Sequence, residues 1–258
     1  MSETLLDVQH IGKRFGGLQA VDDVSFTVAP GCIKSIIGPN GAGKTTIFNM
    51  VAGAFPATSG RILFQGRDVS ALKSHAITHL GIARTFQNVK LFRGMTALQN
   101  VMVGRHCRPR SGFLGAALRL PHAVVEERRI HKAALEQLEF IGLAGKAHED
   151  AASLAFGQQK TLEIARALAT EPGLLLLDEP AAGLNTRETE AVAELICRIR
   201  DRGVTVLLVE HDMSLVMNIS DEVMVMDTGR KLAEGLPRDV QNNPEVIRVY
   251  LGAEYAAE

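Results

Sequence analysis

The distribution of apolar and polar residues predicts strands through the N-terminal third of the chain. Short runs rich in β-forming residues are separated by turns that contain Gly or Pro. The one helix expected in this region, Lys44–Ala52, directly follows a Gly-rich turn. The expected strands are Leu5–His10, Val24–Val28, Ile33–Ile37, Arg61–Phe64 and Ile82–Phe86.

The pattern then changes to helical spacing from about Thr96 to Ala169. Within Glu126–Ile141, apolar residues recur on one helical face, which predicts a helical lobe inserted into a strand-rich domain. After Pro172, strands and helices alternate, which predicts a parallel sheet covered by helices on both faces. The expected elements there are strands Leu174–Leu177, Val204–Val209 and Glu222–Met226 and helix Arg187–Arg200.

Composition narrows the range of functions. The formal net charge is −1, whereas a nucleic-acid-binding protein usually has a basic excess, so no nucleic-acid partner is expected. The three cysteines, at positions 32, 107 and 197, are far apart, which favours a reducing compartment over a disulfide framework. Residues 1–4 do not resemble a signal peptide. The longest apolar runs are much shorter than the ~20 residues that span a bilayer, so a membrane role requires a partner.

The clearest chemical motif is Gly38–Thr46, which matches the pattern G-x-x-x-x-G-K-[ST] between a strand and a helix. Glycines let the backbone curl so that several N–H groups point at a phosphate, and the helix N-terminus adds partial positive charge. Lys44 is expected to contact the β- and γ-phosphates, and the Thr45 hydroxyl is expected to ligate Mg²⁺.

Two acidic residues and a histidine follow two strands of the predicted sheet. The apolar strand from Leu174 leads into Asp178 and Glu179, which are expected to hold Mg²⁺ through water and to activate the attacking water, respectively. His211 follows the strand Val204–Val209, at the edge of a parallel sheet where ligands bind, and is expected to contact the γ-phosphate.

Two further motifs become candidate ligand-binding sites because of their positions relative to these groups. Gln87 follows a strand where the helical lobe begins, so its amide is a candidate ligand for Mg²⁺ or its water. Gly157 precedes the expected helix Lys160–Ala169 and presents N–H groups suited to an anion. Taken alone, this second motif is also an ordinary start of a helix.

The order of these motifs along the chain resembles the ATP-binding cassette (ABC) family over essentially the whole sequence. The resemblance implies an α/β fold: a P-loop NTPase (RecA-like) core with an antiparallel β subdomain and an inserted α-helical subdomain. It implies one ABC domain over 1–258, with a core of 1–88 and 158–258 and an insertion at 89–157. Two such cassettes close head to tail in this family, so that each ATP lies between one phosphate loop and the other chain's signature helix.

The resemblance also assigns roles to individual residues. Phe15 matches the aromatic residue that stacks on adenine, and the catalytic set becomes Lys44, Glu179 and His211. The Mg²⁺ set becomes Thr45, Gln87 and Asp178. The signature facing the partner's ATP is Ala155, Phe156, Gly157 and Gln158. The expected ATP-binding set is Phe15, Val21, Gly38, Pro39, Asn40, Gly41, Ala42, Gly43, Lys44, Thr45, Thr46 and Gln87.

Departures from the family pattern indicate a subgroup. The usual signature is Leu-Ser-Gly-Gly-Gln, but Ala155 and Phe156 replace its Ser and first Gly, and Asn185 replaces the usual Asp of the dimer-contact loop. These features look like those of ATPase subunits of importers for branched-chain and other hydrophobic amino acids. That resemblance implies a second, related ATPase as heterodimer partner, two permease subunits, an indirectly linked solute-binding protein, and a peripheral position on the cytoplasmic face of the inner membrane.

Several alternatives stay open at this point. An exporter motor for lipid or lipopolysaccharide shares the same motifs, and a non-transport cassette ATPase shares the fold. The transported solute is not specified, since the cassette does not touch it. The basic segment Arg105–Arg110 suits either anionic lipid headgroups or solvent. Leu91, Phe92 and Met95 are expected to line a groove for a short cytoplasmic helix of the permease.

Overall fold

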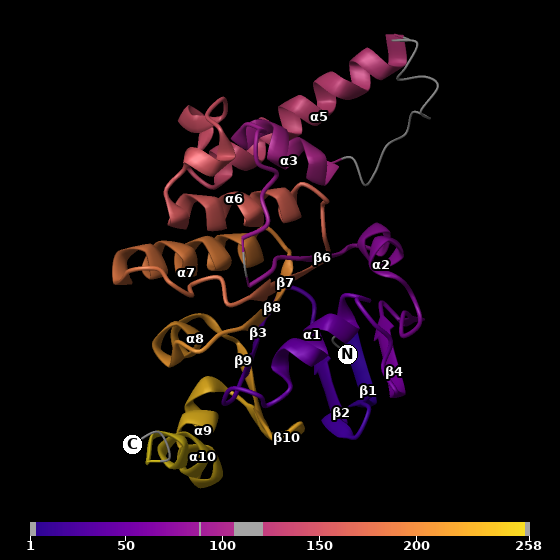
Figure 1. Cartoon of the computed structure of the whole chain (residues 1–258), viewed down its shortest axis with the longest axis vertical. Coiled ribbons are helices and arrows are strands. Elements are labelled where there is room, and N and C mark those ends of the chain that lie inside the picture. The colour runs from indigo at the N-terminus through magenta and orange to yellow at the C-terminus, as the bar shows by residue number, and fades with distance from the viewer. Residues whose placement is uncertain (1–3, 88, 106–120, 256–258) are drawn as a thin grey trace.

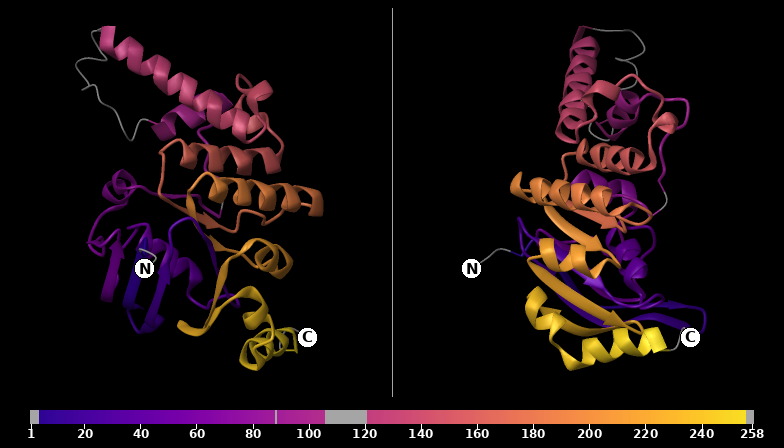
Figure 2. Two further views of the ribbon diagram at one scale, coloured as in Figure 1. Left: turned by 180° about the vertical axis from the view of Figure 1, so that it is seen from behind. Right: turned by 90° about the vertical axis from the view of Figure 1, so that its left-hand side faces the viewer.

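A computed structural model describes residues 4–87, 89–105 and 121–255 of the chain (Figure 1). The molecule is elongated, with a group of helices at one end, a large twisted sheet in the middle and a smaller antiparallel sheet beside it. The C-terminal helices cover the end opposite the helical lobe (Figure 2). Residues 106–110, which carry most of the basic segment, lie outside the described residues.

The larger sheet has six strands in the order β10-β9-β3-β8-β7-β6, and all neighbours are parallel except the β9–β10 pair. Every residue of β3, β7 and β8 is buried, because helices cover both faces, as the apolar runs predicted. Strand β10 was not predicted, since its sequence is polar and only partly buried. The six strands are β3 (Ile33–Ile37), β6 (Ile82–Arg84), β7 (Leu174–Asp178), β8 (Thr205–Val209), β9 (Glu222–Asp227) and β10 (Arg230–Gly235).

The smaller sheet is antiparallel, in the order β2-β1-β4-β5. Its first two strands are longer than predicted, because register shifts after Val8 and Ile11 break the alternation on which the prediction depended. Helix α1 (Lys44–Val51) packs Ile47 and Phe48 into a core shared by both sheets. The strands are β1 (Leu6–Phe15), β2 (Leu18–Val28), β4 (Ser59–Phe64) and β5 (Arg67–Asp68).

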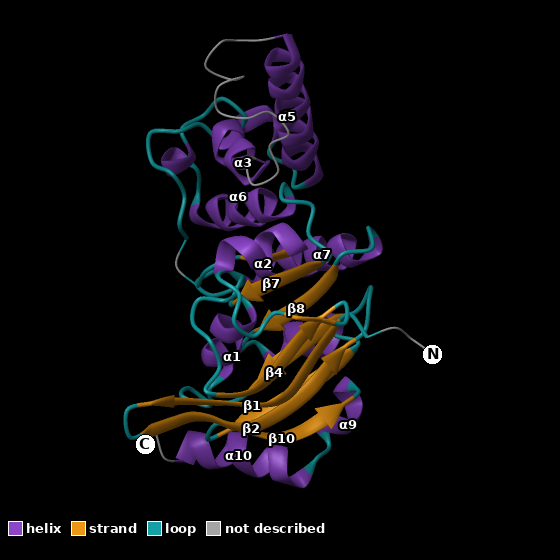
Figure 3. Ribbon diagram, turned by 90° about the vertical axis from the view of Figure 1, so that its right-hand side faces the viewer, coloured by secondary structure: helices purple, strands orange, loops and turns teal. Residues whose placement is uncertain are grey.

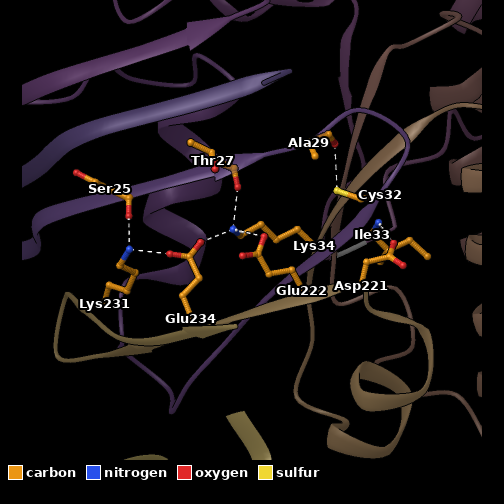
Figure 4. A network of polar contacts seen from close by, with 10 residues as sticks. All are labelled: Ser25, Thr27, Ala29, Cys32, Ile33, Lys34, Asp221, Glu222, Lys231 and Glu234. Carbon is orange, nitrogen blue, oxygen red and sulfur yellow. Dashed lines mark hydrogen bonds and ion pairs between the residues drawn. The ribbon is translucent and has the colours of Figure 1, made fainter. Parts of the chain in front are cut away.

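A buried lysine ties the two sheets together (Figure 4). Lys34 on β3 has no exposed surface, and its Nζ donates to the carbonyl oxygen of Thr27 at 2.7 Å. The same ammonium pairs with Glu222 at 2.8 Å and with Glu234. A buried charge is tolerated when it is paired and hydrogen-bonded in this way. The network therefore fixes β2 against β9 and β10.

The helical lobe contains α3 (Ala97–Arg105), α5 (Pro121–Phe140) and α6 (Phe156–Leu168), and α7 (Thr186–Asp201) lies below α6 (Figure 1). Helix α6 starts earlier than predicted, because the Gln158 side chain accepts from the backbone N–H of Ala155 and caps it. One face of α6 packs into the lobe and the other onto β7 and α7, so α6 joins the lobe to the sheet. The lobe also contains two short 3₁₀ turns, Ala144–Lys146 and Ala151–Ser153, whereas α2 (Ser74–Leu80) packs its Ile77 into the core shared by the two sheets.

The C-terminal end adds α8 (Met213–Ile219), α9 (Pro237–Gln241) and α10 (Pro244–Tyr255). Helices α9 and α10 lie beside β10 (Figure 3). Val240 and Val246 pack against Val223 and Val225 of β9. Across the described ranges, no helix combines the length and the apolar character needed to span a bilayer.

Candidate active site

A pocket of about 660 Å³ opens beside the Gly38–Gly43 loop, at the edge where the parallel strands β3, β7 and β8 end. Nine of the residues expected to bind ATP line it, and so do the catalytic candidates Glu179 and His211. The lining residues are Phe15, Leu18, Gln19, Ala20, Asn40, Gly41, Ala42, Gly43, Lys44, Thr45, Thr46, Gln87, Glu179, His211, Thr228 and Gly229.

The loop conformation requires glycine at two positions. Gly38 has a φ of 146°, and a Cβ placed there would lie 2.1 Å from the carbonyl oxygen of Met226. Gly43 has a φ of 97°, and a Cβ there would lie 2.6 Å from the carbonyl oxygen of Ala20. Close packing of the loop backbone against β2 and β9 therefore excludes side chains. The loop ends at the N-terminus of α1, whose first N–H groups are suited to binding a phosphate.

Lys44, the first residue of α1, is buried against this loop. Its Nζ donates to the carbonyl oxygens of Gly38 at 2.6 Å and Pro39 at 2.9 Å. Burial lowers the pKa of the Lys44 ammonium, and the nearby carboxylates of Glu179 and Asp178 oppose that shift. The ammonium thus lies between the loop carbonyls and the acidic side of the pocket, within the field of both carboxylates.

Asp178, at the end of β7, lies behind the pocket wall. Its Oδ2 pairs with Arg84 Nη2 at 2.8 Å, while its buried Oδ1 has no hydrogen-bond partner among the described residues. An unsatisfied buried carboxylate oxygen is costly unless another group reaches it. Thr45 and Gln87 add oxygen ligands in the pocket, and oxygen ligands are the type that Mg²⁺ prefers. The described residues contain no cluster of three or more His, Cys, Asp or Glu side chains suited to a metal.

Glu179 is held by groups at the ends of two other strands, β6 and β8. Its Oε2 accepts a hydrogen bond from Gln87 Nε2 at 2.7 Å, and its Oε1 lies 2.5 Å from His211 Nε2. Its backbone has a φ of 50°, a left-handed conformation that is uncommon for a residue with a side chain. Its N–H donates to the carbonyl oxygen of Val209 on β8 at 2.9 Å. Sequence reasoning named Gln87, Glu179 and His211 separately, and the structure brings all three together.

Glu210 is a buried carboxylate that sequence reasoning did not name. Its Oε1 accepts from the N–H of Ala181 at 2.7 Å, and its Oε2 accepts from the N–H of His211 at 3.0 Å. Burial raises the pKa of the Glu210 carboxyl. Glu210 therefore links the turn that follows Glu179 to His211, whose ring contacts the Glu179 carboxylate. Its position immediately before His211 is the only signal the sequence offers.

The opposite wall of the pocket is apolar and open. The Phe15 ring is 46% exposed and packs edge-on against Phe55, with ring centroids 5.4 Å apart. Leu18 is 67% exposed and lies next to Phe15 on the β1–β2 hairpin. An exposed aromatic ring beside a phosphate loop suits a flat heterocycle. Val21, also expected in this site, is fully buried and lies beneath Gly43 instead of lining the pocket.

Five lining residues, Leu18 among them, were not expected from the sequence. Gln19 and Ala20 come from the hairpin that follows Phe15, and Thr228 and Gly229 form the tight turn between β9 and β10. Gly229 donates its N–H to the carbonyl oxygen of Ala42 at 3.2 Å, which places this turn against the phosphate loop. The Thr-Gly pair after an apolar strand predicts a turn, but only the tertiary fold shows where that turn lies.

The signature residues Ala155–Gln158 form the start of α6, and none of them lines the described pocket. Phe156 is 50% exposed. Gly157 is close enough to Glu188 that a Cβ there would lie 2.8 Å from its Oε1. Gly183, in the expected dimer-contact loop Ala182–Asn185, packs against the Phe156 ring. The two expected halves of an ATP site, phosphate loop and signature, are thus on separate surfaces of one chain.

Comparison with known families and proteins gives a consistent result. Residues 21–182 match the ABC transporter family model, and residues 230–256 match the model described as branched-chain amino acid ATP-binding cassette transporter. The chain is similar to the high-affinity branched-chain amino acid transport ATP-binding protein BraF of Pseudomonas aeruginosa, with 46% identity over 253 residues covering 98% of this chain and 99% of BraF.

The protein of the same description from Escherichia coli K12, LivG, is also 46% identical, over 257 residues that cover 98% of this chain and 99% of LivG. Among solved structures, the ADP conformation of an ATP-binding cassette of an ABC transporter superposes with a TM-score of 0.84. That cassette is 34% identical, and the match covers 96% of this chain and 99% of the cassette.

Proposed function

Because the chain belongs to the ABC transporter family of ATP-binding subunits, we propose that its pocket binds ATP and that Glu179 directs the hydrolysis that drives import of branched-chain or other hydrophobic amino acids. The observation that carries the proposal is the convergence of Gln87 and His211 on the Glu179 carboxylate, beside the phosphate loop. A base held between an amide and an imidazole, next to an anion-binding helix start, has the arrangement that attack by water on a phosphate requires.

Each part of the pocket has a defined role in this proposal. Phe15 stacks on adenine, the N–H groups of the loop and α1 hold the phosphates, and Lys44 turns from the loop carbonyls to the β- and γ-phosphates. Glu179 orients the attacking water and accepts its proton. His211 and Gln87 hold the Glu179 side chain in place and contact the γ-phosphate.

Thr45, Gln87 and Asp178 would hold Mg²⁺ with the nucleotide. Asp178 Oδ1, which no described group reaches, is suited to accept from a water on the ion. When bound, the ion would neutralise negative charge on the oxygens of the transferred phosphate. Arg84 holds the other oxygen of Asp178 at 2.8 Å and thereby fixes the direction of Oδ1.

The separation of signature and pocket supports a composite site. In the working transporter the signature at the start of α6 covers the nucleotide bound by a second, related ATPase. The signature of that ATPase in turn covers the nucleotide bound by this chain. Two permease subunits complete the membrane part, and a solute-binding protein delivers the amino acid to them. The chain itself sits peripherally on the cytoplasmic face of the membrane. The exposed Phe92 and Met95, with the half-buried Leu91, form the surface offered to the permease.

The test is amino-acid uptake in a strain that lacks this gene and carries either the wild-type chain or Lys44→Ala. Uptake of radiolabelled leucine, isoleucine and valine should return only with the wild-type chain. Uptake of an unrelated solute, such as a sugar, should be equal in both strains. Equal recovery of all three amino acids by the Lys44→Ala chain would contradict the proposal.

A further inference from the structure

The signature helix α6 carries charged side chains on its buried side. Lys160, Glu163 and Arg166 are spaced at i, i+3 and i+6, so they follow one face of the helix, at the junction between the lobe and the sheet. Lys160 is 5% exposed and Glu163 is 3% exposed. Charged residues are rarely buried to this degree without a specific partner.

Lys160 contacts the catalytic turn directly. Its Nζ donates a hydrogen bond to the backbone carbonyl oxygen of Glu179 at 3.0 Å. The N–H of Glu179 is held on the other side by the carbonyl oxygen of Val209. Both peptide groups that flank the Glu179 Cα are therefore restrained, and the left-handed conformation of this residue is fixed from two directions.

The same ammonium also contacts the signature. Lys160 Nζ lies 5.5 Å from the centroid of the Phe156 ring, which is within the range of a cation–π interaction. Phe156 is half exposed and belongs to the four residues expected to face the partner's nucleotide. Lys160 thus lies between a side chain on the dimer-facing surface and the backbone of the residue that activates water.

Glu163 and Arg166 hold a second segment of the pocket to the same helix. Glu163 Oε1 accepts from the backbone N–H of Lys90 at 3.3 Å, and Arg166 Nη1 donates to the carbonyl oxygen of Lys90 at 2.5 Å. Arg166 also pairs with Glu163 at 3.2 Å. Lys90 is three residues after Gln87, so α6 restrains both the Gln87 segment and the Glu179 turn.

We propose that Lys160 is a positioning residue that couples the signature to catalysis: when Phe156 engages the nucleotide of the partner ATPase, Lys160 holds the Glu179 peptide in the conformation that directs its carboxylate at water. The inference rests on the function proposed above. Lys160 acts through Glu179 and does not touch the substrate. A methionine would fill the same space without the cost of burying a charge, so packing alone does not account for a lysine here.

The test measures kcat and KM for ATP of the assembled transporter with Lys160→Met. We expect KM to stay within about twofold and kcat to fall about tenfold, as loss of a hydrogen bond from a charged donor predicts. Lys160→Arg keeps a charged donor and should recover most of kcat. Lys132→Met, at a side chain 81% exposed on α5, is the matched control and should behave as wild type. If Lys160→Met does not fold, Lys160→Gln, whose amide is too short to reach Glu179, should give the same loss.

A double mutant separates positioning from general structural damage. Single-turnover hydrolysis is compared for Glu179→Gln with and without Lys160→Met. If Lys160 acts through Glu179, the second substitution adds no further loss. A full tenfold further loss, or a kcat of Lys160→Met equal to wild type, would overturn the inference while leaving the proposed function intact. A Glu179→Gln transporter that hydrolyses ATP at the wild-type rate would overturn both.

Discussion

Gln87 Nε2 and Glu179 Oε2 lie 2.7 Å apart, and this hydrogen bond joins the segment after β6 to the end of β7. Gln87 is also where the chain leaves the sheet for the helical lobe, so a movement of the lobe changes a contact of the residue assigned to water activation. This hydrogen bond thus links the start of the helical lobe to the Glu179 carboxylate.

Lys44→Ala should abolish tight ATP binding or hydrolysis. Lys44 supplies a full positive charge to the phosphate loop, and the backbone N–H groups around it carry only partial charges. Equilibrium binding of a fluorescent ATP analogue and steady-state ATPase activity measure the effect. Lys146→Ala, at a lysine that pairs with the neighbouring Glu149 on the lobe surface, is the control. Wild-type affinity together with wild-type turnover in Lys44→Ala would contradict the assignment of the phosphate loop.

Phe92→Asp should release the permease subunits while leaving folding and ATP binding unchanged. Phe92 is 47% exposed, and its backbone is fixed by Asn100, so the ring is presented on a rigid segment. A carboxylate at this position would have to be desolvated on docking. Co-purification of the permease with the tagged chain measures the effect.

The control for Phe92→Asp is Leu236→Asp, since Leu236 is 60% exposed and lies between β10 and α9, two elements at the end of the molecule opposite the helical lobe (Figure 1). That variant should retain the permease. The docking assignment fails if Phe92→Asp still co-purifies with the permease, or if it unfolds because the ring belongs to the core of the lobe.

Stability should depend on pH through Glu210. Burial raises the folded-state pKa of this carboxyl above its ordinary value of 4.5. A raised folded-state pKa adds stability that is complete below 4.5 and is lost as the pH rises through the folded-state value. The free energy of unfolding of the wild type, relative to Glu210→Gln, should therefore fall as the pH rises from 4.5 towards neutrality. Urea unfolding across this range measures it, and a constant or growing difference would contradict the sign.

The isolated chain should have low ATPase activity, and addition of the related ATPase should raise it. Ala155 lacks the signature hydroxyl, and loss of a hydrogen bond to a charged group costs roughly 1.5–3 kcal/mol, which lowers site occupancy about tenfold or more. A homodimer combines two such signatures, whereas a heterodimer gives this chain's phosphate loop an intact one. Transporter-level turnover by this chain alone, at concentrations where it self-associates, would contradict the asymmetric arrangement.

The elements that sequence patterns predicted well are those buried on both faces. Ile33–Ile37 was predicted with its observed bounds, since its three isoleucines lie between a turn and the Gly-rich phosphate loop. Strand β10 was missed because it is a polar edge strand that only its antiparallel partner defines. The start of α6 was placed too late because Gly157, a poor helix former, lies in its first turn.

The chemical motifs were predictable one by one, but their contacts were not. The spacing around Lys44 and the run ending in Asp178 and Glu179 follow from local chemistry. Glu210 accepts from the N–H of Ala181, 29 positions away, and Lys160 donates to the carbonyl oxygen of Glu179, 19 positions away. A hydrogen bond to such a distant backbone group leaves no pattern in the sequence. Val21 lies on a strand whose pairing with β1 has register shifts. The alternation of apolar and polar residues therefore could not show that the Val21 side chain points into the core.

The proposed function requires that Glu179 activate water for hydrolysis of ATP bound in this pocket. Glu179→Gln preserves the shape of the side chain and its contacts but removes its ability to accept a proton. The decisive measurement is single-turnover hydrolysis of radiolabelled ATP by the assembled transporter, with ATP affinity measured in parallel. ATP affinity should be unchanged, and hydrolysis should be slower by ~10²–10⁴-fold, the usual contribution of a general base. Hydrolysis within a few-fold of the wild-type rate would contradict this role of Glu179.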